Sequence, residues 1–318
     1  MASSNKAIYA AIAGNGLIAV TKFIGAAISG SSAMITEGIH SVVDTGNGGL
    51  LLLGKSRSQL PPDKKHPFGY GKELYFYTLI VAVLIFGVGG GVSIYEGILH
   101  TMHPGEIKEA GYSFFGFTFG GLTLNLVVLG LAMIFEGYAL TVAWNEFKKV
   151  RGDTPVWEAV RTGKDPTAFM VLFEDAAAEA GLIVAAIGIS LAHWLEMPVL
   201  DGIASIGIGV ILCIVASFLV WESRGLLLGE SADPAVTDSI REIARADDAV
   251  QEVRRALTMH MGPQDVILNL DLTFFEDLSA EEVEEAVDRM ERNVREKHAE
   301  VNHIFIEAES LAGRKRPA

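Results

Sequence analysis

The stretch GIHSVVDT, residues 38–45, lies inside an apolar segment that extends over residues 33–54. At a helix rise of about 1.5 Å per residue, such a segment is long enough to cross the roughly 30 Å hydrocarbon core of a bilayer. His40 and Asp44 are four residues apart and therefore share one face of a helix. An ionisable side chain at this depth costs on the order of 3 kcal/mol, so it persists where it has a partner or a task. The stretch therefore predicts a membrane helix with a polar site on one face.

The composition is that of a membrane protein. Hydrophobic residues make up 50% of the 318 residues and charged residues 20%, with 34 glycines, whereas soluble domains usually carry more charge. The net charge of -14 argues against a nucleic-acid partner. The one cysteine, Cys213, excludes a disulfide framework and a cysteine zinc knuckle. The N-terminus MASSNK lacks the basic region and cleavage site of a signal peptide, so the first apolar run is expected to be a retained helix.

Apolar runs long enough to span a bilayer recur through the first part of the chain. They lie near residues 7–29, 33–54, 74–98, 113–143, 168–193 and 199–221. We therefore expect an all-α transmembrane domain of six helices over residues 1–222, which would carry out transport. The fourth run is long enough to project beyond the bilayer.

Beyond the last apolar run, the sequence has the character of a small soluble domain. Two segments, DPAVTDSIREIARAD and SAEEVEEAVDRMERNVREKH, have helical spacing. Asp233 is the expected N-cap of the first, and Ser279 with Glu282 forms a capping box in the second. Strands are expected in VQEVRRALTMHMG, DVILNLDLTFF and EVNHIFIEAE. The order α-β-β-α-β predicts an α+β domain over residues 230–312, followed by a disordered tail over residues 313–318.

Basic residues are distributed unevenly over the expected loops. Those in the loops after the second and fourth apolar runs are Lys55, Arg57, Lys64, Lys65, Lys72, Lys148, Lys149, Arg151, Arg161 and Lys164. The loops after the first, third and fifth runs offer only Lys108. The positive-inside rule then places both termini and the soluble domain in the cytoplasm. We expect a multi-pass integral protein of the cell's inner (plasma) membrane.

A second group of acids lies in the fifth apolar run, in VLFEDAAAEAG. Asp175 and Glu179 share one helix face, while Glu174 points roughly 100° away. Small residues surround these acids and allow another helix to approach closely. If this helix faces the one with His40 and Asp44, the combined nitrogen and oxygen donors suit zinc or another divalent first-row metal.

The alternative is that these buried groups pair with one another or with helix backbones as structural contacts. Clustered carboxylates repel one another unless a cation or protons join them, which favours a cation site. Glu37 is expected in a water-exposed or helix-end role, and Glu136 in a structural role near the inner end of its helix.

Two motifs, SSAMITEGIHSVVDT and HPFGYGKELY, resemble the cation diffusion facilitator family of metal exporters. The six apolar runs and the C-terminal α-β-β-α-β pattern are similar to that family as well, so the resemblance covers residues 7–310. It looks most like the branch that includes zinc transporter nine. The resemblance implies a homodimer in which the C-terminal domain serves for dimerisation.

The resemblance also implies a transport site built from i, i+4 pairs on the second and fifth helices. These pairs fall on His40 with Asp44, and on Val171 with Asp175. Val171 cannot bind a metal ion, so Glu174, Glu179 or water would complete the site, with a slight preference for Glu174. The candidate ligands are therefore His40, Asp44, Asp175, Glu174 and Glu179.

Two further metal sites of the family are incomplete in this sequence. In the loop between the second and third helices, the matching residues are Asp63, His66 and Tyr70, where Tyr70 stands in place of a histidine. A protonated phenol is a poor zinc ligand, so a weak or absent loop site is expected. The alternative role of this basic loop is to bind anionic membrane lipid. The family's zinc pair in the C-terminal domain falls on Arg254, Asn269, Glu307 and Glu309, which implies a domain without it.

These features predict a transporter and not an enzyme. We expect export of a divalent metal ion, zinc first, by alternating access coupled to proton antiport, because a metal and a proton compete for the same lone pairs. An imidazole accepts a proton near physiological pH, which suits this exchange. No cofactor is expected. The alternatives are an exporter of manganese, iron or cobalt and a membrane-anchored metal sensor, while an intramembrane metalloenzyme would need a motif such as HExxH, which is absent.

Overall fold

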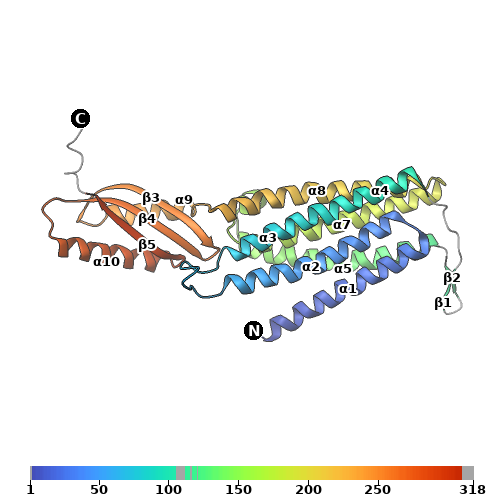
Figure 1. Cartoon of the computed structure of the whole chain (residues 1–318), viewed down its shortest axis with the longest axis horizontal. Coiled ribbons are helices and arrows are strands. Elements are labelled where there is room, and N and C mark those ends of the chain that lie inside the picture. Colours follow the sequence, from blue (N-terminus) through green and yellow to red (C-terminus); the bar gives the residue numbers. More distant parts are fainter. Residues whose placement is uncertain (1, 105–111, 115–116, 120, 310–318) are drawn as a thin grey trace. The chain divides into compact units, whose positions relative to one another are not determined.

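The computed structural model describes residues 2–104, 112–114, 117–119 and 121–309 (Figure 1), with side chains for residues 15–28, 30–104 and 122–308. The tail predicted to be disordered, residues 313–318, lies outside the described residues. The chain forms two compact units. The first combines Met1–Gly54, Phe76–Arg161 and Pro166–Ser223, and the second combines Lys55–Tyr75, Thr162–Asp165 and Arg224–Ala318.

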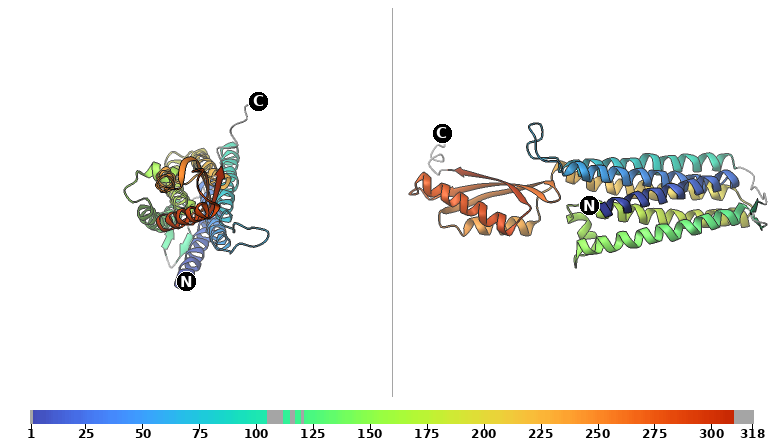
Figure 2. Two further views of the ribbon diagram at one scale, coloured as in Figure 1. Left: turned by 90° about the vertical axis from the view of Figure 1, so that its left-hand side faces the viewer. Right: turned by 90° about the horizontal axis from the view of Figure 1, so that it is seen from below.

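The first unit consists mainly of long helices that run side by side (Figures 1 and 2). Its helices are α1 (Ala2–Ser29), α2 (Ser32–Ser58), α3 (Glu73–Leu84), η1 (Ile85–Gly91), α4 (Val92–Met102), α5 (Gly121–Arg151), α6 (Val156–Thr162), α7 (Pro166–Trp194) and α8 (Val199–Leu228). The segments α3, η1 and α4 follow one another without a break, and η1 is a π-helical insert. The third apolar run therefore forms one rod with a π-helical middle.

The fourth apolar run becomes helical later than predicted. Helix α5 begins at Gly121, whereas the run was expected to start near residue 113. The preceding residues include two short antiparallel strands, β1 (Tyr112–Phe114) and β2 (Phe117–Phe119). Aromatic residues and threonine favour extended backbone, which is why an apolar stretch here does not continue the helix.

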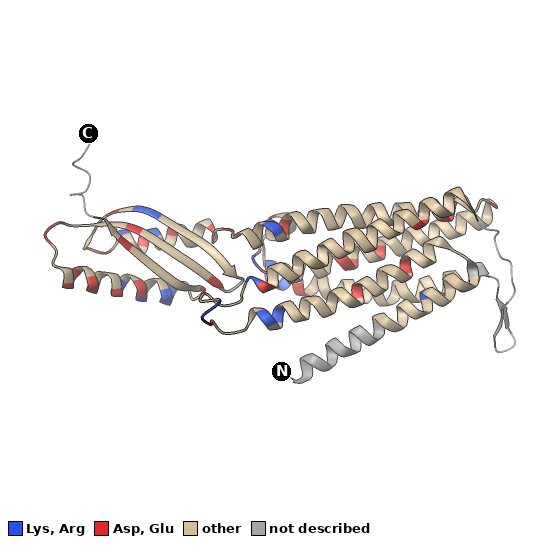
Figure 3. Cartoon of the chain, viewed as in Figure 1, with Lys and Arg blue, Asp and Glu red and all other residues tan. Residues whose placement is uncertain are grey.

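Three helical stretches in the described part of the chain are long and apolar enough to cross a membrane. They are Glu73–Met102, Leu122–Arg151 and Val199–Leu228, with mean hydropathies of 2.1, 2.0 and 2.7. Helix α1 contributes a shorter apolar stretch, Asn15–Ile28. Helices α2 and α7 contain a few charged residues between long uncharged stretches (Figure 3). These charged residues lower the mean hydropathy of the two helices. The six membrane spans therefore stay a prediction for α1, α2 and α7.

Glycines bring the rod formed by α3, η1 and α4 into backbone contact with α8. A Cβ atom on Gly97 would lie 2.7 Å from the Gly202 carbonyl oxygen, and one on Gly209 would lie 2.8 Å from the Gly90 carbonyl oxygen. Only residues without a side chain allow two helices to approach this closely. Gly90 belongs to η1, and π-helical inserts are frequent at functional sites.

Replacing Gly97 with Leu is expected to destabilise the protein by about 3 kcal/mol or more, because the added side chain meets a backbone that cannot move aside. The matched control is Gly130→Leu on α5, where a Cβ atom meets nothing within 4 Å. Thermal unfolding of the two purified variants in detergent measures the difference. Equal unfolding temperatures would show that this helix contact contributes nothing to stability.

The second unit contains a three-stranded sheet with two helices. Its elements are α9 (Pro234–Arg245), β3 (Val250–Gly262), β4 (Asp265–Phe274), α10 (Ala280–Lys297) and β5 (Val301–Glu309). The strand order is β3-β4-β5, with β3 antiparallel and β5 parallel to the central strand β4. This arrangement confirms the predicted α-β-β-α-β order. A parallel neighbour needs a crossover connection, and α10 supplies it between β4 and β5.

Local signals in the sequence account for the ends of these helices. The Asp233 carboxylate accepts a hydrogen bond from the Ala235 amide at 2.8 Å and caps α9. The Ser279 hydroxyl accepts from the Glu282 amide at 3.3 Å, and the Ser279 amide donates to the Glu282 carboxylate at 2.7 Å. Both predicted caps are thus confirmed, and each pairs backbone amides that the first helical turn leaves free.

The core of the second unit lies between one sheet face and the helices. The alternate residues of β4 that point into it are Val266, Leu268, Leu270 and Leu272, all fully buried. Asn269 between them is exposed. Helix α10 covers this face with Ala286, Met290 and Val294, which lie one turn apart along it. The period of two in the strand and the helical period in α10 therefore meet in one apolar core.

His260 on β3 makes the second unit sensitive to acid. Its side chain is buried, and Nδ1 lies 3.1 Å from the Gly262 carbonyl oxygen, to which it donates. Burial lowers the pKa of this imidazole below its usual value of 6.5. As the pH falls below about 6.5, the unfolded chain gains a proton that the folded domain resists, so stability is present above this pH and falls below it.

Replacing His260 with Gln is therefore expected to reduce the loss of stability between pH 7.5 and pH 5.5. The measurement is the unfolding temperature of the second unit's transition in the full chain at both pH values. His303→Gln on β5 is the matched control, since that histidine is only partly buried. An unchanged pH dependence in the His260 variant would contradict the assignment.

Candidate metal site

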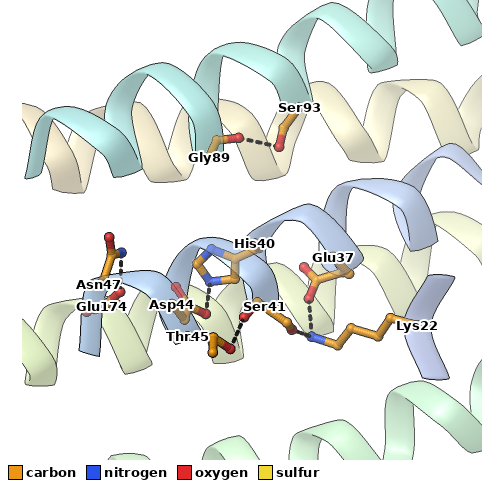
Figure 4. Close-up of polar contacts among 10 residues, drawn as sticks. All are labelled: Lys22, Glu37, His40, Ser41, Asp44, Thr45, Asn47, Gly89, Ser93 and Glu174. Atoms are coloured by element: carbon orange, nitrogen blue, oxygen red, sulfur yellow. Dashed lines mark hydrogen bonds and ion pairs between the residues drawn. The ribbon is translucent and has the colours of Figure 1, made fainter. Parts of the chain in front are cut away.

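The candidate site begins with a histidine and an aspartate on one buried face of α2. His40 Nε2 lies 3.4 Å from Asp44 Oδ2 across one helical turn (Figure 4). The imidazole is 1% exposed, and neither ring nitrogen has a hydrogen-bond partner among the described residues. Asp44 Oδ1 is equally unpartnered. Buried donors and acceptors are nearly always paired, so these free atoms mark a place suited to a bound cation or proton.

Glu174 comes to this pair from α7. Its Oε1 accepts a hydrogen bond of 2.7 Å from the amide nitrogen of Asn47, which lies on α2 one turn beyond Asp44 (Figure 4). The carboxyl groups of Glu174 and Asp44 lie within interaction range of each other. The amide oxygen of Asn47 has no partner in the described part of the chain. Asn47 thus forms an interhelical contact and adds an oxygen next to the carboxylates.

Small residues determine which face of α7 meets α2. Ala177, Ala178 and Gly181 are buried on the same face as Glu174. At the other end of this contact, a Cβ atom on Gly181 would lie 2.7 Å from Glu37 Oε1. Glu37, which comes earlier in α2 than Asn47, lies beside Gly181, which comes later in α7 than Glu174. The two helices are therefore antiparallel. This register places Glu174, and not its neighbour, opposite Asp44.

The other predicted ligands of α7 lie away from the pair on α2. Asp175 is half-buried, and no contact joins it to His40 or Asp44 among the residues the structure describes. Val171, one turn earlier, is 36% exposed. Glu179 is half-buried, with Oε2 facing Gly137 of α5 at 3.9 Å from a Cβ atom placed there. Of the three acids predicted on this helix, the structure brings Glu174 to Asp44 and Asn47.

The proposed donor atoms lie near one another, but they are not arranged around one common position that an ion could occupy. Within the described ranges, no three His, Cys, Asp or Glu side chains are grouped tightly enough to hold a metal ion. The Asn47 amide donates a hydrogen bond to the Glu174 carboxylate, and neither His40 ring nitrogen has a hydrogen-bond partner within the described part of the chain. A rotation of the Glu174 and His40 side chains would be needed to bring nitrogen and oxygen donors to one ion.

A buried ion pair next to the site was not anticipated from the sequence. Lys22 on α1 donates from Nζ to Glu37 Oε2 at 3.1 Å and to Ser41 Oγ at 2.8 Å, and both charged side chains are fully buried (Figure 4). The expectation that Glu37 is water-exposed or at a helix end is therefore wrong. A lone lysine in an apolar helix needs a partner at bilayer depth, and this requirement is the signal that points to Glu37.

A second polar cluster joins the start of α2 to α8. Asp201 is buried and accepts hydrogen bonds from the Ser31 hydroxyl at 2.8 Å and from the Ser32 amide at 2.6 Å. His100 Nε2 of α4 lies 3.7 Å from the same carboxylate. Asp201 thereby caps the first turn of α2, which fixes the end of the helix that carries His40.

The basic loop uses its candidate ligands for folding. Asp63 accepts hydrogen bonds from the Lys65 amide at 2.8 Å, the His66 amide at 2.6 Å and the Tyr70 hydroxyl at 2.8 Å. These hydrogen bonds lower the pKa of Asp63, and the one from the His66 amide has the largest effect. His66 Nδ1 lies 3.6 Å from the same carboxylate. An acid whose lone pairs already accept three hydrogen bonds has little capacity for a metal ion, so the geometry favours a structural turn.

Comparison with known proteins shows similarity along nearly the whole chain. The chain is 29% identical over 342 residues to "Proton-coupled zinc antiporter SLC30A9, mitochondrial" of Mus musculus, covering 95% of this chain and 58% of that protein. It is 32% identical over 275 residues to "Metal tolerance protein C4" of Arabidopsis thaliana, covering 85% and 57%. It is 22% identical over 302 residues to "Magnetosome protein MamM" of Paramagnetospirillum magneticum, covering 94% and 86%. The chain thus spans somewhat more than half the length of the first two relatives.

The transmembrane unit carries the signature of one sequence family. The family described as the cation efflux transmembrane domain matches residues 8–228. This match includes most of α1 and all of α2 to α8, and with them the His40 and Asp44 pair, Glu174 and Lys22. The chain therefore belongs to the cation diffusion facilitator family.

Proposed function

We propose that this protein exports a divalent metal ion, zinc first, across a membrane in exchange for protons. The observation that carries the proposal is the buried pair of His40 and Asp44, with unpartnered nitrogen and oxygen atoms and with Glu174 held against it. The relatives named proton-coupled zinc antiporter support both zinc as the substrate and protons as the exchanged ion.

The proposed ligands are His40, Asp44 and Glu174. One imidazole nitrogen and carboxylate oxygens form a donor set that suits zinc in a tetrahedral site, whose fourth position Asn47 or water would fill. Asp175 and Glu179, half-buried on α7, would serve as neighbouring acids along the path of the ion. Each ligand must lose its proton to bind the metal, so metal release and proton uptake are two halves of one exchange.

Alternating access requires the helices around the site to move as rigid bodies. The glycine contact between Gly97 and Gly202 and the π-helical insert η1 provide a smooth surface on which the α3–α4 rod can slide against α8. The Asp201 cap holds the start of α2 to α8, so it is a contact that such a movement must keep or break. We propose that these contacts define the moving boundary in the bundle.

The location and assembly of the protein also remain proposals. We propose residues 1–222 as the transport domain and residues 230–312 as a cytoplasmic dimerisation domain, with both termini on the side of the basic loops. The predicted plasma-membrane location has no support from the relatives, several of which are named as mitochondrial. The homodimer rests on the family resemblance.

The proposal is tested with the purified full chain in sealed liposomes. An imposed proton gradient should drive zinc across the membrane, and a protonophore should abolish this accumulation. Competition by manganese, iron and cobalt ions in the same assay ranks the substrates, and we expect zinc to be preferred. Zinc transport that does not depend on the proton gradient would contradict antiport. If none of these metals crosses the membrane, the proposed transport function is wrong.

A further inference from the structure

Lys22 is a positive charge built into the interior of the helical unit. Its side chain is fully buried, and Nζ binds Glu37 Oε2 at 3.1 Å and Ser41 Oγ at 2.8 Å (Figure 4). Burying an ammonium group is unfavourable unless oxygen atoms replace its water, and here a carboxylate and a hydroxyl do so. The oxygen atoms around Nζ therefore form a pocket suited to a cation, and the ammonium group of Lys22 occupies it.

More acidic groups lie within electrostatic range of Lys22 than one ammonium group neutralises. Glu37 Oε1 has no hydrogen-bond partner among the described residues and points at Gly181 of α7, where a Cβ atom would lie 2.7 Å away. Glu136 of α5 and Glu179 of α7 lie within electrostatic range of Glu37, and Glu179 Oε2 is also buried and unpartnered. Carboxylates from three helices thus lie within electrostatic range of one buried ammonium group.

This pocket adjoins the proposed metal site. Glu37 lies three residues before His40 on α2, so the two share one helix face about one turn apart. Ser41, which binds Lys22, is the next residue after His40. The charge of Lys22 lies within electrostatic range of both His40 and Asp44. A divalent ion at the metal site would therefore feel repulsion from Lys22.

We propose that Lys22 is a tethered cation that fills a second cation subsite, formed by Glu37, Ser41 and the acids beside them, next to the proposed metal site. While Lys22 fills this subsite, a second divalent ion cannot bind, and the first ion is held loosely enough to leave. This role of Lys22 in transport rests on the proposed function, whereas the subsite itself rests only on the contacts of Lys22.

Equilibrium dialysis of zinc against the purified full chain tests the subsite. Lys22→Met removes the charge and keeps the length of the side chain, and it is expected to bind one more zinc ion per protomer than the unmodified protein. Lys22→Met with Glu37→Gln removes the acid as well and should lose this extra ion. Lys22→Arg keeps the charge and should bind as the unmodified protein does, as should the exposed control Lys149→Met.

Two further measurements keep the test decisive. If Lys22→Met folds only when zinc is added, and the double variant with Glu37→Gln folds without it, the subsite is supported. The subsite is contradicted if folded Lys22→Met binds the same amount of zinc as the unmodified protein. It is also contradicted if Lys22→Met does not fold in the presence of zinc although the double variant folds. Adding His40→Ala and Asp44→Ala to Lys22→Met separates the proposals, because the extra ion should remain even when the proposed metal site is removed.

Transport kinetics test the effect of the tethered charge. In liposomes, Lys22→Met should lower the zinc concentration for half-maximal transport by about tenfold or more and lower the maximal rate, because the repulsion between Lys22 and the bound ion is lost. A purely structural role would lower the maximal rate and leave the half-maximal concentration unchanged.

Discussion

Replacing either His40 or Asp44 with Ala is expected to reduce proton-driven zinc transport by about 100-fold or more, because each change removes a proposed ligand that lies at the centre of the site. The assay is zinc movement into liposomes that contain the purified variant under an imposed proton gradient. Folding should survive the loss of the His40 ring, since neither of its nitrogen atoms has a hydrogen-bond partner among the described residues.

The matched controls are His103→Ala and Asp153→Ala, which replace the same residue types at exposed positions. Both controls should transport zinc at the unmodified rate. Full activity of the His40 and Asp44 variants would show that the α2 pair is not the metal site. Loss of activity together with loss of the folded peak in size-exclusion chromatography would instead assign the pair a structural role.

Substitutions of the acids of α7 are expected to differ strongly in how much zinc transport they remove in the same assay. Glu174→Gln should lower zinc transport by about 100-fold, because Glu174 is the carboxylate held against Asn47 and Asp44. Glu179→Gln, on the same helix but toward α5, should lower it less than about tenfold. Glutamine keeps the size and the hydrogen-bonding of the side chain, so the comparison isolates the negative charge.

Asp175→Asn decides between the arrangement in the structure and the one implied by the family resemblance. The structure places Glu174 beside Asp44 and Asn47, whereas the resemblance assigns Asp175 to the transport site. A loss of transport in Asp175→Asn equal to that of Glu174→Gln would mean that α7 rotates to bring both acids to the ion during the cycle. Activity in Glu174→Gln and none in Asp175→Asn would overturn the ligand set proposed here.

The charge balance inside the helical unit explains why a metal site would have an ammonium group beside it. His40 is the one imidazole in a region where, within the described residues, Glu37, Glu136 and Glu174 are buried and Asp44 is partly buried. Several carboxylates at low dielectric would repel one another and bind protons or metals too tightly to release them. Lys22 pairs with one of these acids, Glu37, which leaves the remaining acids to exchange an ion and protons.

Much of this architecture was predictable because it depends on short-range periodicity. The i, i+4 spacing of His40 and Asp44 puts them on one face in any α-helix, and their closest atoms lie 3.4 Å apart. The caps at Asp233 and Ser279 and the alternation through β4 follow from neighbours within four residues. The onset of α5 at Gly121 was missed, since apolar character alone does not distinguish a helix from the aromatic strands before it.

The amino-acid sequence by itself determined which side chains share a face on each helix, because that face depends only on the helical repeat. The tertiary structure alone decided which faces meet. Ala177, Ala178 and Gly181 let α7 lie against α2 with Glu174 toward Asp44, and the packing of α1 brings Lys22 to Glu37 across a gap in the sequence. How far each helix turns about its own axis is set by the fit of two surfaces, and no single segment contains that information.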